Sequence, residues 1–367
     1  MTSRPPAQPG DPLAGIETPA LVLDLDLFER NLARMAEDAA RLGIRLRPHG
    51  KAHKCPEIAR RQVAQGAVGI CCQKVDEAEA FVREGISDVL LTNQVVHPAK
   101  LARLATLAQD ARIGLCVDDA LHVTRAAEAA AAQDVELDVY IEIEVGQRRC
   151  GLPVGANLVP LAQRIAETPH LRFAGLHAYH GNAQHMRSPA ERTAAIGAAA
   201  DLVREAIALL KEAGIDVPLV TGAGTGTYEL EAASGLWGEI QPGSYAFMDA
   251  DYARNEAESP FDNALTLHAT VLSTAVPGQA VLDFGLKAVA VDSGPPLPLS
   301  VVTDVLGVSD EHTILAQPEG AALSVGDHVI LQPGHVDPTC NLHDWIVAKR
   351  AERVEALWPI SARGAGL

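Results

Sequence analysis

Features typical of secreted and membrane proteins are scarce in this sequence. Its 367 residues include only six cysteines, at irregular spacings and without a Cys-x-x-Cys pair, which is too few for a disulfide framework. No apolar run is long enough to span a membrane, and residues 1–13 lack the apolar core of a secretion signal. We therefore predict a soluble, cytoplasmic protein with buried free thiols.

Positively charged residues are also fewer than negatively charged ones. Lysine and arginine total 30 against 47 aspartates and glutamates, which gives a formal net charge of −17. This balance argues against nucleic acid or an anionic membrane surface as a main partner. The hydrophobic content of 48% supports a sizeable core, and the chain is longer than one core usually holds, so we expect two domains.

Short apolar runs alternate with amphipathic helical patterns over the first two thirds of the chain. Strands are expected at Ala20–Leu25, Ile44–Pro48, Val68–Gln73, Val89–Asn93, Ile113–Val117, Leu137–Val145, Leu171–Tyr179, Leu219–Thr221 and Glu239–Ala246. Asp26 is a candidate cap for a helix after the first strand, and further helices are expected at 56–65, 75–84, 98–109, 120–133, 156–167 and 188–213. About eight strand–helix units favour a (β/α)8 barrel over the alternative, an open doubly wound sheet.

The pattern changes after about residue 255. Runs that alternate apolar and polar residues follow, separated by proline and glycine turns, at Leu265–Ser273, Ala280–Phe284, Ser300–Val308, His328–Leu331, Trp345–Ala348 and Arg353–Trp358. We predict a barrel over residues 18–255 and a smaller antiparallel β-domain over residues 256–367. Residues 1–17 are expected to be a flexible lead or to pack on the β-domain.

Lys51 lies in a basic segment, Arg47–Lys54, directly after the expected strand Ile44–Pro48. Neighbouring cations and partial burial favour the neutral amine, and a neutral lysine forms a Schiff base with an aldehyde cofactor or a carbonyl substrate. A solvated basic loop is the alternative interpretation of this segment.

Polar segments also follow two later strands. Arg149, in the segment Glu144–Gly151, stands at a strand end where an arginine can hold a phenolate, a carboxylate or a phosphate. Tyr179 and His185 follow the next strand, where they can orient a ring or move protons. The alternatives are a solvated loop for the arginine and structural roles for the histidines of this segment.

A glycine-rich turn, Thr221–Thr227, follows a late strand, which is where barrels commonly bind phosphate. Glycines let backbone N–H groups approach an anion, and the threonine hydroxyls add donors. Ser244 and Tyr245, after the next strand, are further candidate donors. The turn matches neither the dinucleotide-binding nor the ATP-binding glycine motif, and a purely structural turn is the alternative.

The pair His335 and Asp337 is a candidate metal site. On an extended segment the side chains of a His-x-Asp sequence point to the same face. An imidazole with a carboxylate suits a borderline-to-hard divalent ion such as Mn²⁺, and two protein ligands leave positions open for water and substrate. A turn with polar caps is the alternative.

Taken together, six separated segments resemble the D-threonine aldolase and D-serine dehydratase-like group of fold-type III pyridoxal phosphate enzymes, which is related to alanine racemase. The resemblance runs from about Glu17 to the C-terminus. It rests on Arg47–Lys54, Gly69–Lys74, Gly146–Gly151, Thr221–Gly226, Gly243–Asp249 and His335–Asp344.

The resemblance implies a Schiff base between Lys51 and pyridoxal 5′-phosphate, and it implies a homodimer. It places Arg149 near the cofactor phenolate and Tyr179 beside the ring, and it assigns a divalent metal to His335 and Asp337. It assigns binding of the cofactor phosphate to Gly222, Gly224, Thr225, Gly226, Ser244 and Tyr245. Ala223 stands where the family commonly has a third glycine.

The implied reaction is cleavage of a D-β-hydroxy-α-amino acid at its Cα–Cβ bond. The metal would lower the pKa of the β-hydroxyl, and His185, His53 or a metal-bound water would take its proton. The dehydratases of this group resemble His-x-Cys and hold zinc, so Asp337 favours an aldolase with Mn²⁺ or Mg²⁺.

Several functions stay open at this point. D-Threonine is the expected substrate. The alternatives are 3-hydroxy-D-aspartate, whose second carboxylate needs a cation such as Arg148, Lys287 or His312, and a D-serine dehydratase. A racemase, a cofactor carrier and a cofactor-independent sugar phosphate aldolase are more distant alternatives.

Overall fold

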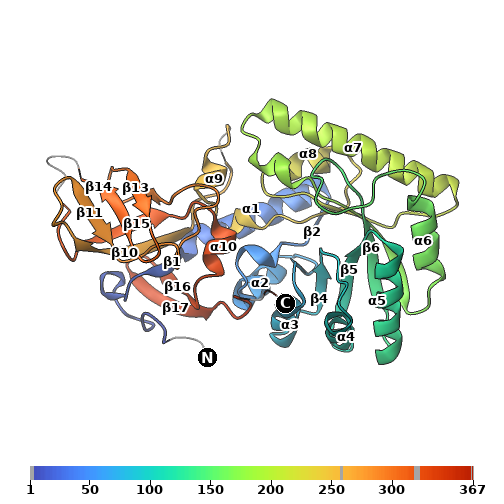
Figure 1. Cartoon of the computed structure of the whole chain (residues 1–367), viewed down its shortest axis with the longest axis horizontal. Helices are drawn as coiled ribbons and strands as arrows, with labels where there is room; N and C mark the ends of the chain where they lie inside the picture. Colours follow the sequence, from blue (N-terminus) through green and yellow to red (C-terminus); the bar gives the residue numbers. More distant parts are fainter. Residues whose placement is uncertain (1–3, 257–258, 318–322, 365, 367) are drawn as a thin grey trace. The chain divides into compact units, whose positions relative to one another are not determined.

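The computed structural model describes residues 4–256, 259–317, 323–364 and 366. The chain forms two compact units. The barrel unit comprises residues 36–51 and 58–243, and the β unit comprises residues up to 35 together with 52–57 and 244–364. Both are drawn in Figure 1.

The barrel unit contains an eight-stranded parallel sheet with the neighbour order β2-β9-β8-β7-β6-β5-β4-β3. Its strands are β2 (Arg45–Leu46), β3 (Ile70–Cys72), β4 (Asp88–Leu91), β5 (Arg112–Val117), β6 (Leu137–Glu142), β7 (Leu171–Ala178), β8 (Val220–Gly222) and β9 (Glu239–Ile240). The sheet closes because the N–H groups of Val68 and Cys71 donate to the carbonyls of Leu46 and Pro48, each at 2.8 Å. The predicted (β/α)8 barrel is therefore confirmed.

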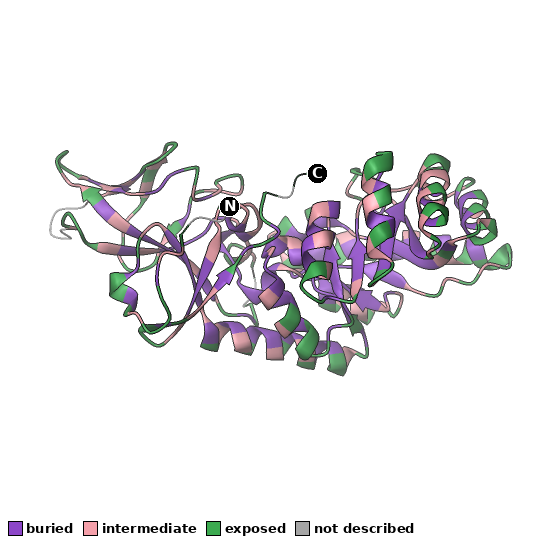
Figure 2. Ribbon diagram, turned by 90° about the horizontal axis from the view of Figure 1, so that it is seen from below, coloured by how far each residue is buried: buried purple, intermediate pink, exposed green. Residues whose placement is uncertain are grey.

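Helices connect the barrel strands and cover the sheet from outside (Figure 1). They are α2 (Pro56–Ala64), α3 (Val75–Arg83), α4 (Pro98–Leu107), α5 (Ala120–Gln133), α6 (Leu158–Glu167), α7 (Pro189–Glu212) and the short α8 (Tyr228–Ala233), which the sequence pattern did not reveal. Figure 2 shows buried residues along the strands and exposed residues on the outer faces of the helices. Among the described residues, no helix combines the length and the apolar character needed to cross a membrane.

Two local expectations for the barrel were wrong. The expected strand Glu239–Ala246 ends at Ile240, because Pro242 and Gly243 break the strand before a 3₁₀ turn at Ser244–Ala246. The cap of α1 (Leu25–Leu42) is Asp24 rather than Asp26. The Asp24 carboxylate accepts hydrogen bonds from the N–H groups of Asp26 and Leu27 at 3.1 and 3.2 Å, as an N-cap does.

The barrel interior also contains buried charge. Arg47, only 2% exposed, donates to the carboxylates of Glu239 at 3.0 Å and Asp88 at 2.6 Å. Burial by itself lowers the pKa of the Arg47 guanidinium. The charges of Glu239 and Asp88 outweigh this effect and raise the pKa above its ordinary value, so the guanidinium stays charged. Arg47 therefore ties β2 to β9 and β4 across the barrel. Removing its guanidinium would leave the buried Glu239 with only Thr221 and the partly exposed Arg45 as partners.

The β unit contains a nine-stranded sheet with the main order β13-β14-β11-β10-β1-β16-β17, in which β15 pairs with β10 and β12. Its strands are β1 (Ala20–Asp24), β10 (Leu265–Ser273), β11 (Gln279–Leu282), β12 (Leu297–Pro298), β13 (Val305–Val308), β14 (Thr313–Ala316), β15 (His328–Gln332), β16 (Trp345–Arg350) and β17 (Arg353–Pro359). The expected strand Ser300–Val308 is confined to β13, and β12 and β14 were missed.

Strand β1 was expected to open the barrel, and this expectation was wrong. β1 pairs antiparallel with β10 and parallel with β16, so it is a central strand of the β unit. Its neighbours in the core include the leading segment, since Ala7, Leu13 and Ile16 are buried against Val22 and Val354. The described part of the leading segment therefore packs on the β unit.

The β unit also has two short helices, α9 (Ala250–Ala253) and α10 (Val336–Cys340). The sequence pattern suggested no helix after residue 255, so α10 was not expected. Pro338 and Asp337 suit the first turn of a helix, where a fixed φ and a negative charge are favourable. The Thr339 hydroxyl donates to the carbonyl of His335 at 2.7 Å and closes this turn.

Candidate active site

The Lys51 side chain projects from a 3₁₀ turn, Gly50–Ala52, directly after β2. Lys51 is half-buried, and its backbone N–H donates to Nδ1 of His49 at 3.4 Å. Gly50 fits tightly against the barrel wall, because a Cβ atom there would lie 2.6 Å from the ring of Phe81 and 2.9 Å from Ile70. A glycine at this position lets the turn lie directly on the sheet and fixes where Lys51 begins.

Arg149 and Tyr179 meet at the carboxyl end of the barrel. The guanidinium carbon of Arg149 lies 5.9 Å from the centre of the Tyr179 ring. The two residues follow neighbouring strands, β6 and β7, and Lys51 follows β2. The carboxyl ends of parallel barrel strands share one rim, which is where barrel enzymes place their active sites. The predicted cofactor lysine, arginine and tyrosine thus all belong to this rim.

The glycine-rich turn after β8 is tightly packed against β7 and the turn that follows β7. A Cβ at Gly222 would lie 1.9 Å from the carbonyl oxygen of Ala178, and one at Gly224 would lie 2.6 Å from the amide of Gln184. Ala223 adopts a positive φ of 68°. This is the left-handed region that favours glycine, so it agrees with the glycine that the family resemblance leads us to expect at this position.

The same turn fits a phosphate in its backbone shape. A left-handed residue within a glycine-rich turn is typical of concave N–H arrangements that hold anions. The predicted donors Gly222, Gly224 and Thr225 lie in this turn. The N–H of Gly226, also predicted as a donor, is already engaged by Oε1 of Gln184 at 2.8 Å.

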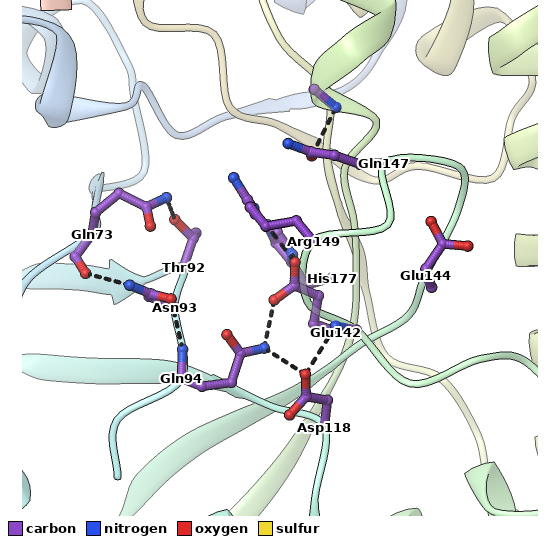
Figure 3. A network of polar contacts seen from close by, with 12 residues as sticks. Gln73, Thr92, Asn93, Gln94, Asp118, Glu142, Glu144, Gln147, Arg149 and His177 are labelled. Atoms are coloured by element: carbon purple, nitrogen blue, oxygen red, sulfur yellow. Dashed lines mark hydrogen bonds and ion pairs between the residues drawn. The ribbon is translucent and has the colours of Figure 1, made fainter. Parts of the chain in front are cut away.

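A polar network beneath the rim was not predicted (Figure 3). Glu142, 4% exposed, lies with Oε1 at 3.6 Å from Nη2 of Arg149. The Gln94 amide donates to the other oxygen of Glu142 at 2.6 Å and to Asp118 at 3.2 Å. The same Asp118 oxygen accepts the N–H of Gly151 at 2.8 Å. The network therefore holds the loop around Arg149 and also faces its guanidinium with a buried carboxylate.

Glu144 and Gln147, both drawn in Figure 3, hold this loop through three further hydrogen bonds. Glu144 accepts the N–H groups of Gly146 at 2.6 Å and Arg148 at 2.8 Å. Oε1 of Gln147 accepts the N–H of Gly181 at 2.9 Å, which joins the loop to the segment after Tyr179. Arg149 is thus carried on a loop that is anchored on both sides of it.

His177, on β7, lies fully inside the barrel next to this network. Its Nε2 is 3.2 Å from Oε1 of Gln241, whose amide nitrogen donates to Thr221 at 2.7 Å. Thr221 in turn donates to Glu239 at 2.8 Å. This chain of donors assigns the proton to Nε2 of His177. Burial lowers the pKa of this imidazole, so the ring is neutral.

Cys116, Glu142 and His177 form a group of metal-type side chains whose ligand atoms all lie within 4.8 Å of one another. Burial raises the pKa of the Cys116 thiol well above its usual range, which keeps the sulfur protonated. Glu142 already faces Arg149 and Gln94, so its negative charge is compensated by protein groups. The group is accordingly explained as part of the polar network beneath the rim.

His335 and Asp337 lie in the β unit at the start of α10. The expected extended segment is wrong here: His335 is extended at φ −146° and caps the helix, but Asp337 lies in its first turn. Nδ1 of His335 is 2.7 Å from Oδ2 of Asp292. The fully buried Asp249 accepts the N–H of Val336 at 3.0 Å, and burial raises the pKa of Asp249 to about 6.

The remaining predicted residues are distributed over both units. His185 is exposed at the end of the turn Gly181–His185 in the barrel unit. His53 is fully buried in the β unit, edge-on to Phe247, and its Nδ1 accepts the N–H of Cys55 at 3.0 Å. Ser244 and Tyr245 are buried in a 3₁₀ turn of the β unit, where the Tyr245 ring packs edge-on against Phe261.

Comparison with known proteins gives one consistent result. The model of the alanine racemase N-terminal domain matches residues 23–251, and that of a putative serine dehydratase domain matches residues 264–348. A D-threonine aldolase from Arthrobacter sp. is 48% identical over 364 residues, which cover 98% of this chain and 96% of that one. The chain belongs to the D-threonine aldolase family.

Two more members of this family support the assignment. A 3-hydroxy-D-aspartate aldolase from Paracoccus denitrificans (strain Pd 1222) is 45% identical over 372 residues, which cover 98% of this chain and 96% of the relative. The crystal structure of D-threonine aldolase from Filomicrobium marinum matches with a TM-score of 0.97 and 47% identity, and the match covers all of both chains. The predicted family and enzyme class, a lyase, are therefore confirmed, and the fold family implies pyridoxal phosphate as cofactor.

Proposed function

We propose that this protein is a D-threonine aldolase, which cleaves D-β-hydroxy-α-amino acids such as D-threonine to glycine and acetaldehyde. The observation that carries the proposal is the full-length match to D-threonine aldolases at 47–48% identity. The placement of Lys51, Arg149 and Tyr179 on one rim of the barrel supports it, because covalent attachment and ring contact need these groups at one edge.

Pyridoxal phosphate fits the residues of this rim. When bound, its pyridine ring accepts the electron pair released as the Cα–Cβ bond breaks. Lys51 would attach the cofactor, and the turn with Gly222, Gly224 and Thr225 would bind its phosphate. Arg149, held against Glu142, would face the phenolate with a fixed positive charge. Ser244 and Tyr245 are retained as predicted phosphate contacts.

A divalent metal fits His335 and Asp337 in its donor chemistry. One imidazole nitrogen and one carboxylate oxygen suit Mn²⁺ or Mg²⁺, and we propose Mn²⁺. The hydrogen bond between His335 and Asp292 is typical of a metal-binding histidine. The metal would supply Lewis-acid polarisation of the substrate β-hydroxyl.

We assign the removal of the β-hydroxyl proton to His185 rather than to His53. His185 is exposed at the end of its turn, whereas His53 is fully buried and uses Nδ1 to accept a backbone N–H. A base must reach the proton that it removes, so an exposed imidazole is better suited. We further propose that the enzyme is a homodimer and acts in the cytoplasm, as the resemblance and the composition suggest.

A second candidate substrate is 3-hydroxy-D-aspartate, because a 3-hydroxy-D-aspartate aldolase is 45% identical over nearly the whole chain. The extra carboxylate of this substrate needs a cation. Lys287 is less suitable because it already forms an ion pair with Glu311 at 2.6 Å. Arg148 is exposed, and its backbone adopts a positive φ of 54°. Arg148 is therefore the better candidate for this second substrate.

The test uses purified protein loaded with pyridoxal phosphate and Mn²⁺. It is incubated separately with D-threonine, L-threonine, 3-hydroxy-D-aspartate and D-serine, and glycine, aldehydes and ammonia are quantified. Glycine with acetaldehyde from D-threonine, and neither from L-threonine, supports the proposal. A faster release of glycine and glyoxylate from 3-hydroxy-D-aspartate would make that compound the preferred substrate. Ammonia and pyruvate from D-serine, without glycine from any substrate, would contradict it in favour of a dehydratase.

A further inference from the structure

The ring of His335 is oriented by a carboxylate from another part of the β unit. Oδ2 of Asp292 lies 2.7 Å from Nδ1 of His335, and the hydroxyl of Ser293 lies 3.5 Å from the same nitrogen. The carboxylate oxygen accepts in this contact, so the N–H at Nδ1 of His335 is the donor. This leaves Nε2 as the ring nitrogen that can bind a metal.

The loop that carries Asp292 is attached at one point to α10 and at another to the segment that follows α10. The N–H of Ala290 donates to the Thr339 hydroxyl at 3.2 Å, and Nε2 of His343 lies 2.7 Å from the carbonyl oxygen of Ala288. Burial lowers the pKa of His343, so its ring is neutral and Nε2–H is the donor in this contact. The position of Asp292 is thus set by hydrogen bonds that do not involve His335.

The backbone of His335 is also fixed on both sides. Its carbonyl accepts the Thr339 hydroxyl at 2.7 Å, and the next N–H, of Val336, donates to the buried carboxylate of Asp249 at 3.0 Å. A fixed backbone leaves the rotation of the imidazole as the main freedom of this side chain. The hydrogen bond to Asp292 removes that freedom and selects the tautomer.

We propose that Asp292 is a positioning residue for the divalent metal: it holds His335 in the Nε2 tautomer and orientation that bind the ion. The inference rests on the metal role of His335 and Asp337 in the proposed function. A carboxylate behind a metal-binding histidine also makes the imidazole a stronger ligand, and losing such a partner typically weakens metal affinity about 10- to 100-fold. In this proposal Asp292 would act only through His335 and would not be a ligand itself.

An ordinary surface ion pair predicts a different behaviour. Asp292 is half exposed, and an exposed carboxylate beside a protonated histidine contributes little to stability or binding. In that case Asp292 could be replaced without any change in metal affinity. The affinity of the protein for Mn²⁺, measured without substrate, therefore separates the two interpretations.

The experiment titrates Mn²⁺ into metal-free, pyridoxal phosphate-loaded protein and measures unbound Mn²⁺ by its EPR signal. Asp292→Ala is expected to weaken Mn²⁺ binding about 10- to 100-fold, and Asp292→Asn less, because an amide still accepts the Nδ1 hydrogen bond. Asp310→Asn, at another exposed aspartate of the β unit, is the matched control and should bind Mn²⁺ as the wild type does. The cofactor absorbance and the metal-free melting temperature should be unchanged in all variants.

Two results would overturn the inference, and they differ in what else they affect. If His335→Ala loses Mn²⁺ binding while Asp292→Ala binds as tightly as the wild type, the metal site stands and Asp292 has no part in it. If the wild type and His335→Ala bind Mn²⁺ equally, the metal role of His335 fails and the inference fails with it.

Discussion

Glu142 is predicted to control cofactor affinity through Arg149. The substitution Glu142→Gln keeps the size of the side chain but removes the negative charge that faces the guanidinium. In the structure Oε1 of Glu142 lies 3.6 Å from Arg149, and Gln94 holds the other oxygen at 2.6 Å. Without the carboxylate, Arg149 loses the contact that directs it toward the proposed cofactor phenolate.

The size of the effect follows from the geometry. Two unit charges 3.6 Å apart interact by about 4–5 kcal/mol at an effective dielectric constant of about 20. The Arg149 side chain is 44% exposed, so solvent screening reduces the useful part to about 1–2 kcal/mol. We therefore expect pyridoxal phosphate to bind roughly 10-fold more weakly, since about 1.4 kcal/mol corresponds to a factor of ten.

The assay is a double-mutant cycle on the apoenzyme. Pyridoxal phosphate affinity is measured by absorbance titration for wild type, Glu142→Gln, Arg149→Ala and the double variant. If Glu142 acts through Arg149, the double variant binds the cofactor no more weakly than Arg149→Ala alone. Glu136→Gln, at an exposed carboxylate just before β6, is the matched control and should leave the affinity unchanged.

The reasoning would be refuted if the double variant lost as much affinity as the two single variants lose together. Additivity would mean that Glu142 affects the cofactor independently of Arg149. An unchanged affinity in Glu142→Gln would show that the loop contacts of Glu144, Gln147 and Gly151 suffice to position the arginine.

Four other predictions address the cofactor, the metal and stability. Lys51→Ala should lose the absorbance of covalently bound cofactor, and a normal spectrum would contradict the role of Lys51. Asp337→Ala should lower kcat by roughly 100-fold or more while cofactor content stays normal, and normal turnover would contradict the role of Asp337. Arg47→Met should destabilise the protein by roughly 3 kcal/mol in urea unfolding. The substitution removes the buried positive charge that Glu239 and Asp88 share, and it leaves Glu239 with only Thr221 and the partly exposed Arg45. A change below about 1 kcal/mol would contradict this. Burial raises the pKa of Glu231 from 4.5 to about 7, so this group favours the fold below pH 4.5 and loses that contribution as the pH rises to about 7. Glu231→Gln should therefore gain roughly 2–4 kcal/mol relative to wild type between pH 4.5 and pH 7, and parallel stability profiles of the two proteins would exclude this role.

The barrel was predictable because parallel strands are buried on both faces and appear as short apolar runs. Each of the eight barrel strands overlaps a predicted run, and β4, β5 and β8 extend one residue beyond theirs. Six helices agree with the prediction to within two residues at each end. Strand β1 was misplaced because its apolar sequence, Ala20–Asp24, is equally suited to a central strand of either sheet. Its pairing with β10, more than 240 residues away, leaves no local signal in the sequence.

The predicted site residues came from strand ends and a family resemblance, and their roles stay predictions. The residues that the sequence reasoning missed have one feature in common: they support another side chain. Glu142 and His177 lie inside apolar strand runs, where a single polar residue is a signal that could have been used. Asp292 gave no such signal, because it lies in a loop and meets His335 only through the fold.

Metal-dependent turnover of D-threonine is the most direct test of the proposed aldolase activity. The pyridoxal phosphate-loaded enzyme is treated with a chelator and dialysed, and glycine formation is measured before and after Mn²⁺ is restored. We predict that glycine formation is lost without metal and returns with Mn²⁺, while the cofactor absorbance is constant throughout. Undiminished glycine formation from the chelated and dialysed enzyme would contradict it.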